Sequence, residues 1–350
     1  MTKKHIQISI EILVAAGIIA VAMYWHSNSA VGIQTVDSGH RQIMGTFGRV
    51  VVIAADKKTG QECISAAFEK VQLIDELMSK YKPTSQISKV NAAAFDRPVV
   101  VDEPVFGLLE KSVAYSKKTD GAFDITVAPL IDLWKEAEEA NSLPGAESLA
   151  AAKAKVGFDK LLLDARHRSV KFTVMGMKLD LGAIAKGYAV DLAVEAAKEH
   201  GALGVMVDLG GNIRCFGQAP QGKKYWIIGL QNPAVLDDNG KNIIGRLKIS
   251  NNSVSTSGNY RRFVTIGGVR HSHIINPATT ASADELSSVT VIAPEAVDAD
   301  ALSTAISVLG LARGLKLIEN TPDTEAILIP NRPQAEIITT RGAEKYLNLP

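Results

Sequence analysis

The chain has 350 residues, 46% of them hydrophobic, and its 38 lysines and arginines nearly balance its 37 aspartates and glutamates. This length corresponds to about two domains or one large one, and the apolar content suffices for a buried core, which excludes a disordered chain. A net charge of +1 excludes the basic surface that duplex nucleic acid requires, so we expect no nucleic-acid partner. Two cysteines, Cys63 and Cys215, are too few for a disulfide scaffold or a cysteine-based zinc site.

Residues 1–30 have the pattern of a targeting segment. Lys3 and Lys4 precede an apolar run from Ile6 to Trp25, as in a signal peptide. The run approaches the roughly 20 residues that span a bilayer, so cleavage and retention as a membrane anchor both stay open, and a buried core helix fits the flanking lysines less well. No cysteine follows the run, which excludes a lipid-modified N-terminal cysteine. We expect an exported chain whose body has equal numbers of positive and negative residues.

Strand and helix patterns alternate along this body. The β-branched run 48–54 predicts a strand, and apolar residues spaced three and four apart predict helices over 63–81 and 183–200. The polar, glycine-containing cluster 141–145 is a possible sub-domain boundary within a domain covering 31–350. Towards the C-terminus, a helix over 297–318 is expected between strands at 286–293 and 325–330. The mixture predicts an α+β fold, or an α/β fold with antiparallel elements.

Four loops carry more glycine and polar residues than turns alone need. Residues 44–48 predict a turn before the first strand, and 120–129 a turn that leads into a short strand. Residues 179–188 predict a strand followed by a helix, with Lys186 at the helix N-terminus, where an anion or phosphate would bind. Residues 207–213 predict a hairpin.

The common nucleotide-binding fingerprints are absent. Residues 217–223 have the glycine and lysine spacing of a P-loop, but Lys224 occupies the position where a hydroxyl must hold magnesium, and no helix pattern follows. No G-x-G-x-x-G motif is present, which argues against a Rossmann site for a flavin or nicotinamide.

Two side-chain pairs are more specific. His271 and His273 are two residues apart, which on a strand places both on one face; this suits zinc, but no third ligand has a matching spacing, and a general acid or base is the alternative. Asp300 and Thr304 are four apart in a predicted helix and so share a face. Acidic residues in a first turn often only complement the helix dipole, but a carboxylate and a hydroxyl facing a cleft also suit Mg²⁺ with its waters and phosphate oxygens.

Seven motifs, taken in order, resemble the ApbE family of FAD:protein FMN transferases over about residues 40–345. They are Met44-Gly45-Thr46, Gly121-Ala122-Phe123-Asp124-Ile125, the segments 180–187, 208–212 and 255–260, His273-Ile274-Ile275-Asn276-Pro277, and the segment 300–304. The resemblance implies an ApbE-like, T-fold-related α+β fold of mixed sheets with packed helices. Thr280 stands where the family commonly has glycine.

The resemblance also implies an activity. Such an enzyme splits FAD with Mg²⁺, attaches FMN by a phosphoester bond to a threonine hydroxyl of a target protein and releases AMP. It works at the periplasmic face of the cytoplasmic membrane, anchored or soluble, and its acceptors are flavoprotein subunits of membrane redox complexes of the quinone reductase or Rnf type. An Mg²⁺-dependent FAD pyrophosphatase and a non-catalytic exported flavin carrier are the alternatives.

Site residues follow from the same resemblance. The metal would be held by the backbone carbonyl of Ala183 and the side chains of Asp300 and Thr304. For the base that accepts the threonine proton, His273 is the candidate, with Asp180 or Asp208 as alternatives. The flavin contacts would be Met44, Tyr81, Ala122, Phe123, Asp124, Asp180, Lys186 and Ile275.

Overall fold

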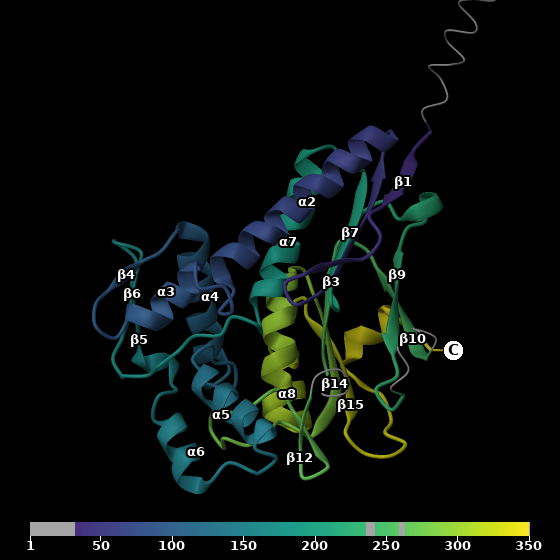
Figure 1. Cartoon of the computed structure of the whole chain (residues 1–350). Helices are drawn as coiled ribbons and strands as arrows, with labels where there is room; N and C mark the ends of the chain where they lie inside the picture. The colour runs from purple at the N-terminus through teal and green to yellow at the C-terminus, as the bar shows by residue number, and fades with distance from the viewer. Residues whose placement is uncertain (1–31, 236–241, 259–262, 350) are drawn as a thin grey trace, which may run out of the picture.

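The computed structural model describes residues 32–235, 242–258 and 263–349, so the targeting segment predicted over 1–30 lies outside them. Elements are labelled as in Figure 1. The α-helices are α2 (Lys57–Met78), α3 (Gln86–Ala93), α4 (Glu103–Lys118), α5 (Ala128–Glu139), α6 (Ala146–Lys153), α7 (Ala185–Glu199) and α8 (Ala296–Glu319). Short 3₁₀ turns cover Phe158–Lys160, Pro220–Gly222 and Arg341–Lys345.

The strands belong to one large sheet and three small ones. The large sheet has the order β1-β3-β7-β8-β11-β14-β15-β16, with β2 also pairing with β3. Its strands are β1 (Gln34–Asp37), β2 (Arg41–Ile43), β3 (Thr46–Ala54), β7 (Gly204–Leu209), β8 (Asn212–Gly217), β11 (Ser253–Gly258), β14 (Leu286–Ala293), β15 (Glu325–Pro330) and β16 (Ile338–Thr339). The small sheets are β4 (Val99–Val100) with β6 (Ser169–Phe172) and β5 (Leu161–Asp164); β12 (Phe263–Ile266) with β13 (Val269–Ser272); and β17 (Leu347–Asn348) with β10 (Ile243–Ile249) and β9 (Trp226–Gln231).

The large sheet is the centre of the molecule and is covered on both faces. Helices α2, α7 and α8 lie on one face, and the small sheet with β9 and β10 lies on the other (Figure 1). Strand β11 shows the alternation that this requires, because Val254 belongs to the core under β9 and β10, whereas Ser255 contacts Ser303 of α8. The sheet therefore separates two interiors.

Helices α7 and α8 come unusually close where α7 begins. A Cβ atom on Gly187 would lie 2.3 Å from the carbonyl oxygen of Ala296 and 2.8 Å from the Cβ atom of Asp300. One turn along α7, the carboxylate of Asp191 accepts the N–H groups of Ala296 and Val297, at 2.9 and 2.8 Å, and so caps the first turn of α8. Glycine and a buried cap thus fix α8 against the start of α7.

The main predicted elements are confirmed. The structure has strands at β3, β14 and β15 and helices at α2, α7 and α8 in the expected places, and β7 and β8 form the expected hairpin. Residues 141–145 lie between α5 and α6. Helix α8 contains a non-helical residue, Gly310, with φ 75° and ψ −177°.

Three local predictions were wrong. The turn at 120–124 leads into α5 rather than into a strand, and the segment before α7 is not a strand either; Val127 and Lys178 form only one isolated bridge. The two histidines do not share a strand face, because β13 ends at Ser272 and His273 lies beyond it. His271 instead packs its ring 5.3 Å from that of Trp134.

Within the described ranges, one helix, α8, is long and apolar enough to cross a membrane by length and composition, and half of its apolar window is buried inside the structure. Because α8 packs on the large sheet and on α7 and contains Asp300 and Thr304, it is a core helix of this fold.

Candidate active site

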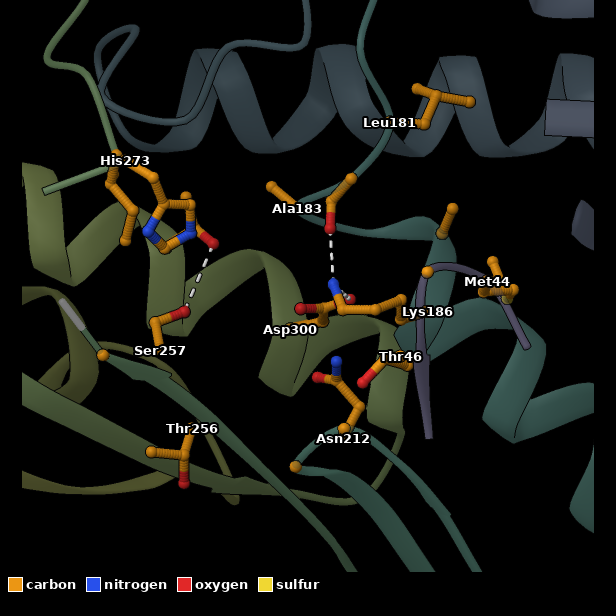
Figure 2. A pocket seen from close by; sticks show the side chains of 18 of the residues that line it. Met44, Thr46, Leu181, Ala183, Lys186, Asn212, Thr256, Ser257, His273 and Asp300 are labelled. Carbon is orange, nitrogen blue, oxygen red and sulfur yellow. Dashed lines mark hydrogen bonds and ion pairs between the residues drawn. The ribbon is translucent and has the colours of Figure 1, made fainter. Parts of the chain in front are cut away.

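A cavity of about 1100 Å³ lies where the loops before α5 and α7 meet the ends of β7, β8 and β11. All the site residues expected from the sequence line it: Met44, Tyr81, Ala122, Phe123, Asp124, Asp180, Ala183, Lys186, His273, Ile275, Asp300 and Thr304. In Figure 2, Asp300 and Lys186 occupy the centre of the labelled group, with His273 and Ser257 on one side and Met44 and Thr46 on the other. The structure thus brings together residues that are up to 260 positions apart.

Asp300 is the most deeply buried charged group of the cavity, with 3% of its surface exposed. Its Oδ2 atom accepts the backbone N–H of Gly187 at 2.9 Å and lies 3.6 Å from Nζ of Lys186. Burial raises the pKa of this carboxyl, while Lys186, the Gly187 N–H and the side chain of Asn212 act to lower it. A buried carboxylate with so few positive partners is well suited to hold a cation.

Ala183, the residue just before the N-cap of α7, also lines the cavity. Gly187 lies in the first turn of α7, where N–H groups have no helix carbonyl to bond, and its N–H donates to Asp300 rather than to the carbonyl of Ala183. The Ala183 carbonyl is therefore available to another ligand on the same side of the cavity. Lys186 donates to the carbonyl of Gly182, so its ammonium stays beside this turn.

Hydroxyl groups surround the other side of Asp300. Ser257 of β11 lies with its Oγ atom 2.8 Å from Oγ of Ser303 and 3.5 Å from Oγ1 of Thr304. Ser255 donates to the side-chain oxygen of Asn212, which orients the amide that faces Asp300. Thr304, one helical turn after Asp300, is thus held by a polar network between α8 and β11.

Lys80, Asp180 and Asp132 form an ion-pair chain at the cavity wall. Nζ of Lys80 lies 2.8 Å from Oδ2 of Asp180 and 3.6 Å from Oδ1 of Asp132. Burial acts to lower the pKa of the Lys80 ammonium, but Asp180, Tyr81 and Asp132 together outweigh burial, so this pKa is raised. Tyr81 is 72% exposed, and its hydroxyl accepts a hydrogen bond from Lys135 at 3.1 Å. The ammonium groups of Lys80 and Lys135 lie 5.4 and 5.2 Å from the centre of its ring.

The segment 122–124 acts mainly through its backbone and shape. The Phe123 side chain is 1% exposed and packs in the core, so its backbone and that of Ala122 form the cavity wall. The Asp124 carboxylate accepts the N–H and hydroxyl of Thr126 and the N–H of Phe158. Burial nevertheless raises the pKa of this carboxyl. Asp124 therefore fixes the loop, and any contact it makes with a ligand is additional to that role.

The remaining predicted residues, Met44, His273 and Ile275, also line the cavity. Met44, in the turn between β2 and β3, has a positive φ of 51°, and Ile275 is 4% exposed and pairs with Ser282 in an isolated bridge. His273, two residues before Ile275 in the sequence, is exposed and lines the cavity. Within the part of the chain that the structure describes, no group of three or more His, Cys, Asp or Glu side chains is placed to hold a metal ion.

Sequence reasoning missed several cavity residues, among them Lys80, Asn212 and Ser257. Asn212 and Ser257 lie inside motifs that were noticed, but their partners are on distant elements, so no local spacing identifies their roles. Lys80 precedes Tyr81 directly, and its proximity to Asp180 appears only in the folded chain.

Known proteins resemble this chain in both sequence and structure. The sequence model of the ApbE family matches residues 44–328 of this chain. The FAD:protein FMN transferase of Klebsiella pneumoniae (strain 342) is 34% identical over 266 residues, covering 76% of this chain and 81% of that protein. The FAD:protein FMN transferase of Treponema pallidum (strain Nichols) is 33% identical, with 82% of each chain covered.

Solved structures share the fold. The ApbE protein of Thermotoga maritima has a TM-score of 0.79 and 29% identity, covering 89% of this chain and 99% of that one. The flavin transferase ApbE from Vibrio cholerae has a TM-score of 0.77 and 25% identity, covering 90% of this chain and 100% of that one. The similarity therefore extends over nearly the whole described body, including the cavity.

Proposed function

The chain belongs to the ApbE family, and we propose that it transfers FMN from FAD to a threonine hydroxyl of an acceptor protein, using Mg²⁺ and releasing AMP. Its class, a flavin transferase, follows from the family and from the curated relatives. The observation that carries the finer proposal is the pairing of buried Asp300 with Lys186 and Thr304 in one large cavity.

The residues present fit a magnesium ion. Asp300 offers a carboxylate oxygen, Thr304 a hydroxyl, and Ala183 the carbonyl that Gly187 does not use, and oxygen donors of these types are those Mg²⁺ prefers. When bound, the ion supplies neutralisation of phosphate charge during phosphoryl transfer. Lys186 contributes a further positive charge at the N-terminus of α7, where the helix dipole also favours a phosphate.

The chain's own residues then bind and orient the flavin and deprotonate the attacking threonine. Tyr81, Met44 and Ile275 present apolar surfaces to the flavin, and the wall at 122–124 and Asp180 complete its binding site. His273 accepts the proton of the attacking threonine, a contribution of roughly 10² to 10⁴ in rate. Asp180 and Asp208 fit this role less well, because Asp180 is paired with Lys80 and Asp208 accepts the N–H of Gly211 at 2.9 Å.

The cellular setting belongs to the same proposal. The segment 1–30 directs the chain out of the cytoplasm, so the enzyme works at the periplasmic face, at the inner membrane if the anchor is retained. Its acceptors are flavoprotein subunits of membrane redox complexes of the quinone reductase or Rnf type. Mass spectrometry of the N-terminus of the mature protein tests this: an uncleaved segment in a cytosolic fraction would contradict export.

The activity is tested by incubating the full chain with FAD, Mg²⁺ and the FMN-binding domain of a quinone reductase subunit, produced without flavin. We expect flavin fluorescence that stays with the acceptor after denaturation, AMP by chromatography, and loss of both with EDTA. An acceptor carrying valine in place of its threonine is the control. FMN and AMP formed equally with or without acceptor, and no adduct, would make the enzyme a pyrophosphatase; FAD recovered intact would make it a carrier.

A further inference from the structure

We propose that the acceptor protein inserts its threonine-bearing segment, as an extended strand, into a second, apolar arm of the cavity between the large sheet and β9–β10. This inference rests on the proposed transferase function, because it concerns the second substrate of that reaction. It assigns a binding surface to residues that have no role in the site described above.

The cavity extends around the end of the large sheet. On the helix side, Ser257 of β11 contacts Ser303 and Thr304, beside Asp300. Val254 and Thr256 of the same strand also line the cavity, although they face the opposite interior. The β7–β8 turn, at Gly210 and Gly211, lines it as well. We call the part on the helix side the polar arm and the part between the large sheet and β9–β10 the apolar arm.

The walls of the apolar arm differ in chemistry from those of the polar arm. They are formed by Ile213 and Val254 of the large sheet and by Ile228, Leu230 and Leu247 of the small one. The hydroxyls of its two threonines, Thr256 and Thr290, are satisfied by each other at 2.9 Å. Among the described residues that line the cavity, no lysine belongs to the apolar arm. Its one charged residue is Asp208 at the end of β7, which faces the same side of the sheet as Met206 and would repel an anion.

This division of charge assigns the substrates. The anionic diphosphate of FAD has its positive partners, Lys80 and Lys186, in the polar arm, whereas the apolar arm offers none. The volume of about 1100 Å³ exceeds the roughly 300 to 1,000 Å³ of a typical small-molecule site, so there is room for part of a second molecule. The acceptor threonine must reach the same phosphorus from a direction that FAD does not occupy. Strand β11 lines both arms, and Ser257 on it lies 3.5 Å from Thr304, one helical turn after Asp300.

Strand β9 favours an extended occupant. It is the terminal strand of its sheet in the part of the chain that the structure describes, and residues 228–231 of it line the cavity. Residues 226–231 contain no charge and no proline, the devices by which proteins usually protect an edge strand from pairing. An added strand gains main-chain hydrogen bonds there, while a small or apolar side chain next to the acceptor threonine enters the arm.

Filling the arm tests the proposal. Leu230→Trp places a large ring in the apolar arm, where Leu230 is 4% exposed. Leu349→Trp is the matched control, since Leu349 follows β17 at the opposite edge of the same small sheet, is 53% exposed and does not line the cavity. We expect Leu230→Trp to raise KM for the FMN-binding acceptor domain by about tenfold or more, with the Kd for FAD unchanged, and Leu349→Trp to behave as wild type.

The outcomes separate the alternatives. A weakened FAD affinity with an unchanged acceptor KM would place part of FAD in the arm and overturn the proposal, and so would no change in either. If the wild-type chain transfers no FMN to any acceptor, the proposed function fails, independently of where the acceptor binds.

A measurement on the wild-type chain covers the case in which Leu230→Trp does not fold. Hydrogen exchange is followed with FAD and Mg²⁺ present, with and without an acceptor domain that carries valine in place of its threonine. We expect slower amide exchange over 227–231 when the acceptor is added. Unchanged exchange there under conditions that support transfer to the unmodified acceptor would overturn the proposal.

Discussion

Replacing Gly187 by alanine tests how strictly the close approach of α7 and α8 is required. The added methyl group would lie 2.3 Å from the carbonyl oxygen of Ala296, so the two helices must separate by more than 1 Å to reach the 3.4 Å of an ordinary contact. The neighbouring atoms are mostly backbone, which cannot rotate away as a flexible side chain can. The separation also moves Asp300 away from the Gly187 N–H that it accepts.

The size of the effect follows from these contacts. Overpacking costs about 1–3 kcal/mol, and the weakened hydrogen bond to the carboxylate costs about 1.5–3 kcal/mol. The higher helix propensity of alanine offsets about 1 kcal/mol of this destabilisation. We therefore expect Gly187→Ala to lower the free energy of unfolding by about 2–4 kcal/mol, and a shift of about 1 Å at Asp300 to slow FMN transfer by about a hundredfold.

Urea unfolding and the rate of FMN transfer measure the two effects. Gly107→Ala in α4 is the control, because the nearest atom to its added Cβ is Oε1 of Glu103 at 3.8 Å. That variant should gain up to about 1 kcal/mol and keep full activity. Wild-type stability and activity in Gly187→Ala would refute the argument that this glycine sets the spacing of the two helices.

Four further predictions concern single side chains. Asp300→Ala should abolish Mg²⁺-dependent transfer with an unchanged circular dichroism spectrum, and full activity would remove Asp300 from the metal site. Tyr81→Ala should weaken FAD binding about tenfold in a fluorescence titration with unchanged stability, since the side chain is 72% exposed; an unchanged Kd would show that it does not contact FAD. Thr280 has φ 65°, which is costly for a β-branched residue, so Thr280→Gly should raise the free energy of unfolding by about 1 kcal/mol, and a lower urea midpoint would contradict this. Burial raises the pKa of Asp191 to about 6 from an ordinary 3.8. Its protonation therefore stabilises the fold below pH 4, and this stabilisation is lost as pH rises through about 6. In urea unfolding between pH 4 and 7, Asp191→Asn should remove this pH dependence of the free energy of unfolding, which amounts to up to about 3 kcal/mol.

Local periodicity was sufficient for the parts of the site that lie on one helix. Asp300 and Thr304 were identified as a pair because four-residue spacing fixes their common face, and Lys186 because its position at the start of a helix follows from the sequence pattern. The partners that hold these residues, Asn212 and Ser257, could not be assigned a role, since their contacts depend on how the sheet brings β8 and β11 beneath α8.

The two incorrect strands have a physical explanation. The segment before α7 is apolar like a strand, but the side-chain amide of Asn91 both donates to the carbonyl of Leu179, at 3.0 Å, and accepts its N–H, at 2.7 Å. The segment after Phe123 is held likewise by the Asp124 carboxylate. Side chains thus take the place of a neighbouring strand, and no local sequence pattern reports such long-range satisfaction of the backbone.

The alternation of strand β11 has a consequence for how specificity can evolve. Ser255 and Ser257 face Asp300 and its surroundings, whereas Val254 and Thr256 face the arm that we assign to the acceptor. Neighbouring positions on one rigid strand therefore serve different substrates. Substitutions at 254 or 256 can change which acceptor protein is modified without altering how the flavin nucleotide is cleaved. After gene duplication, one copy could therefore become specific for a new acceptor by substitutions on one side of a single strand.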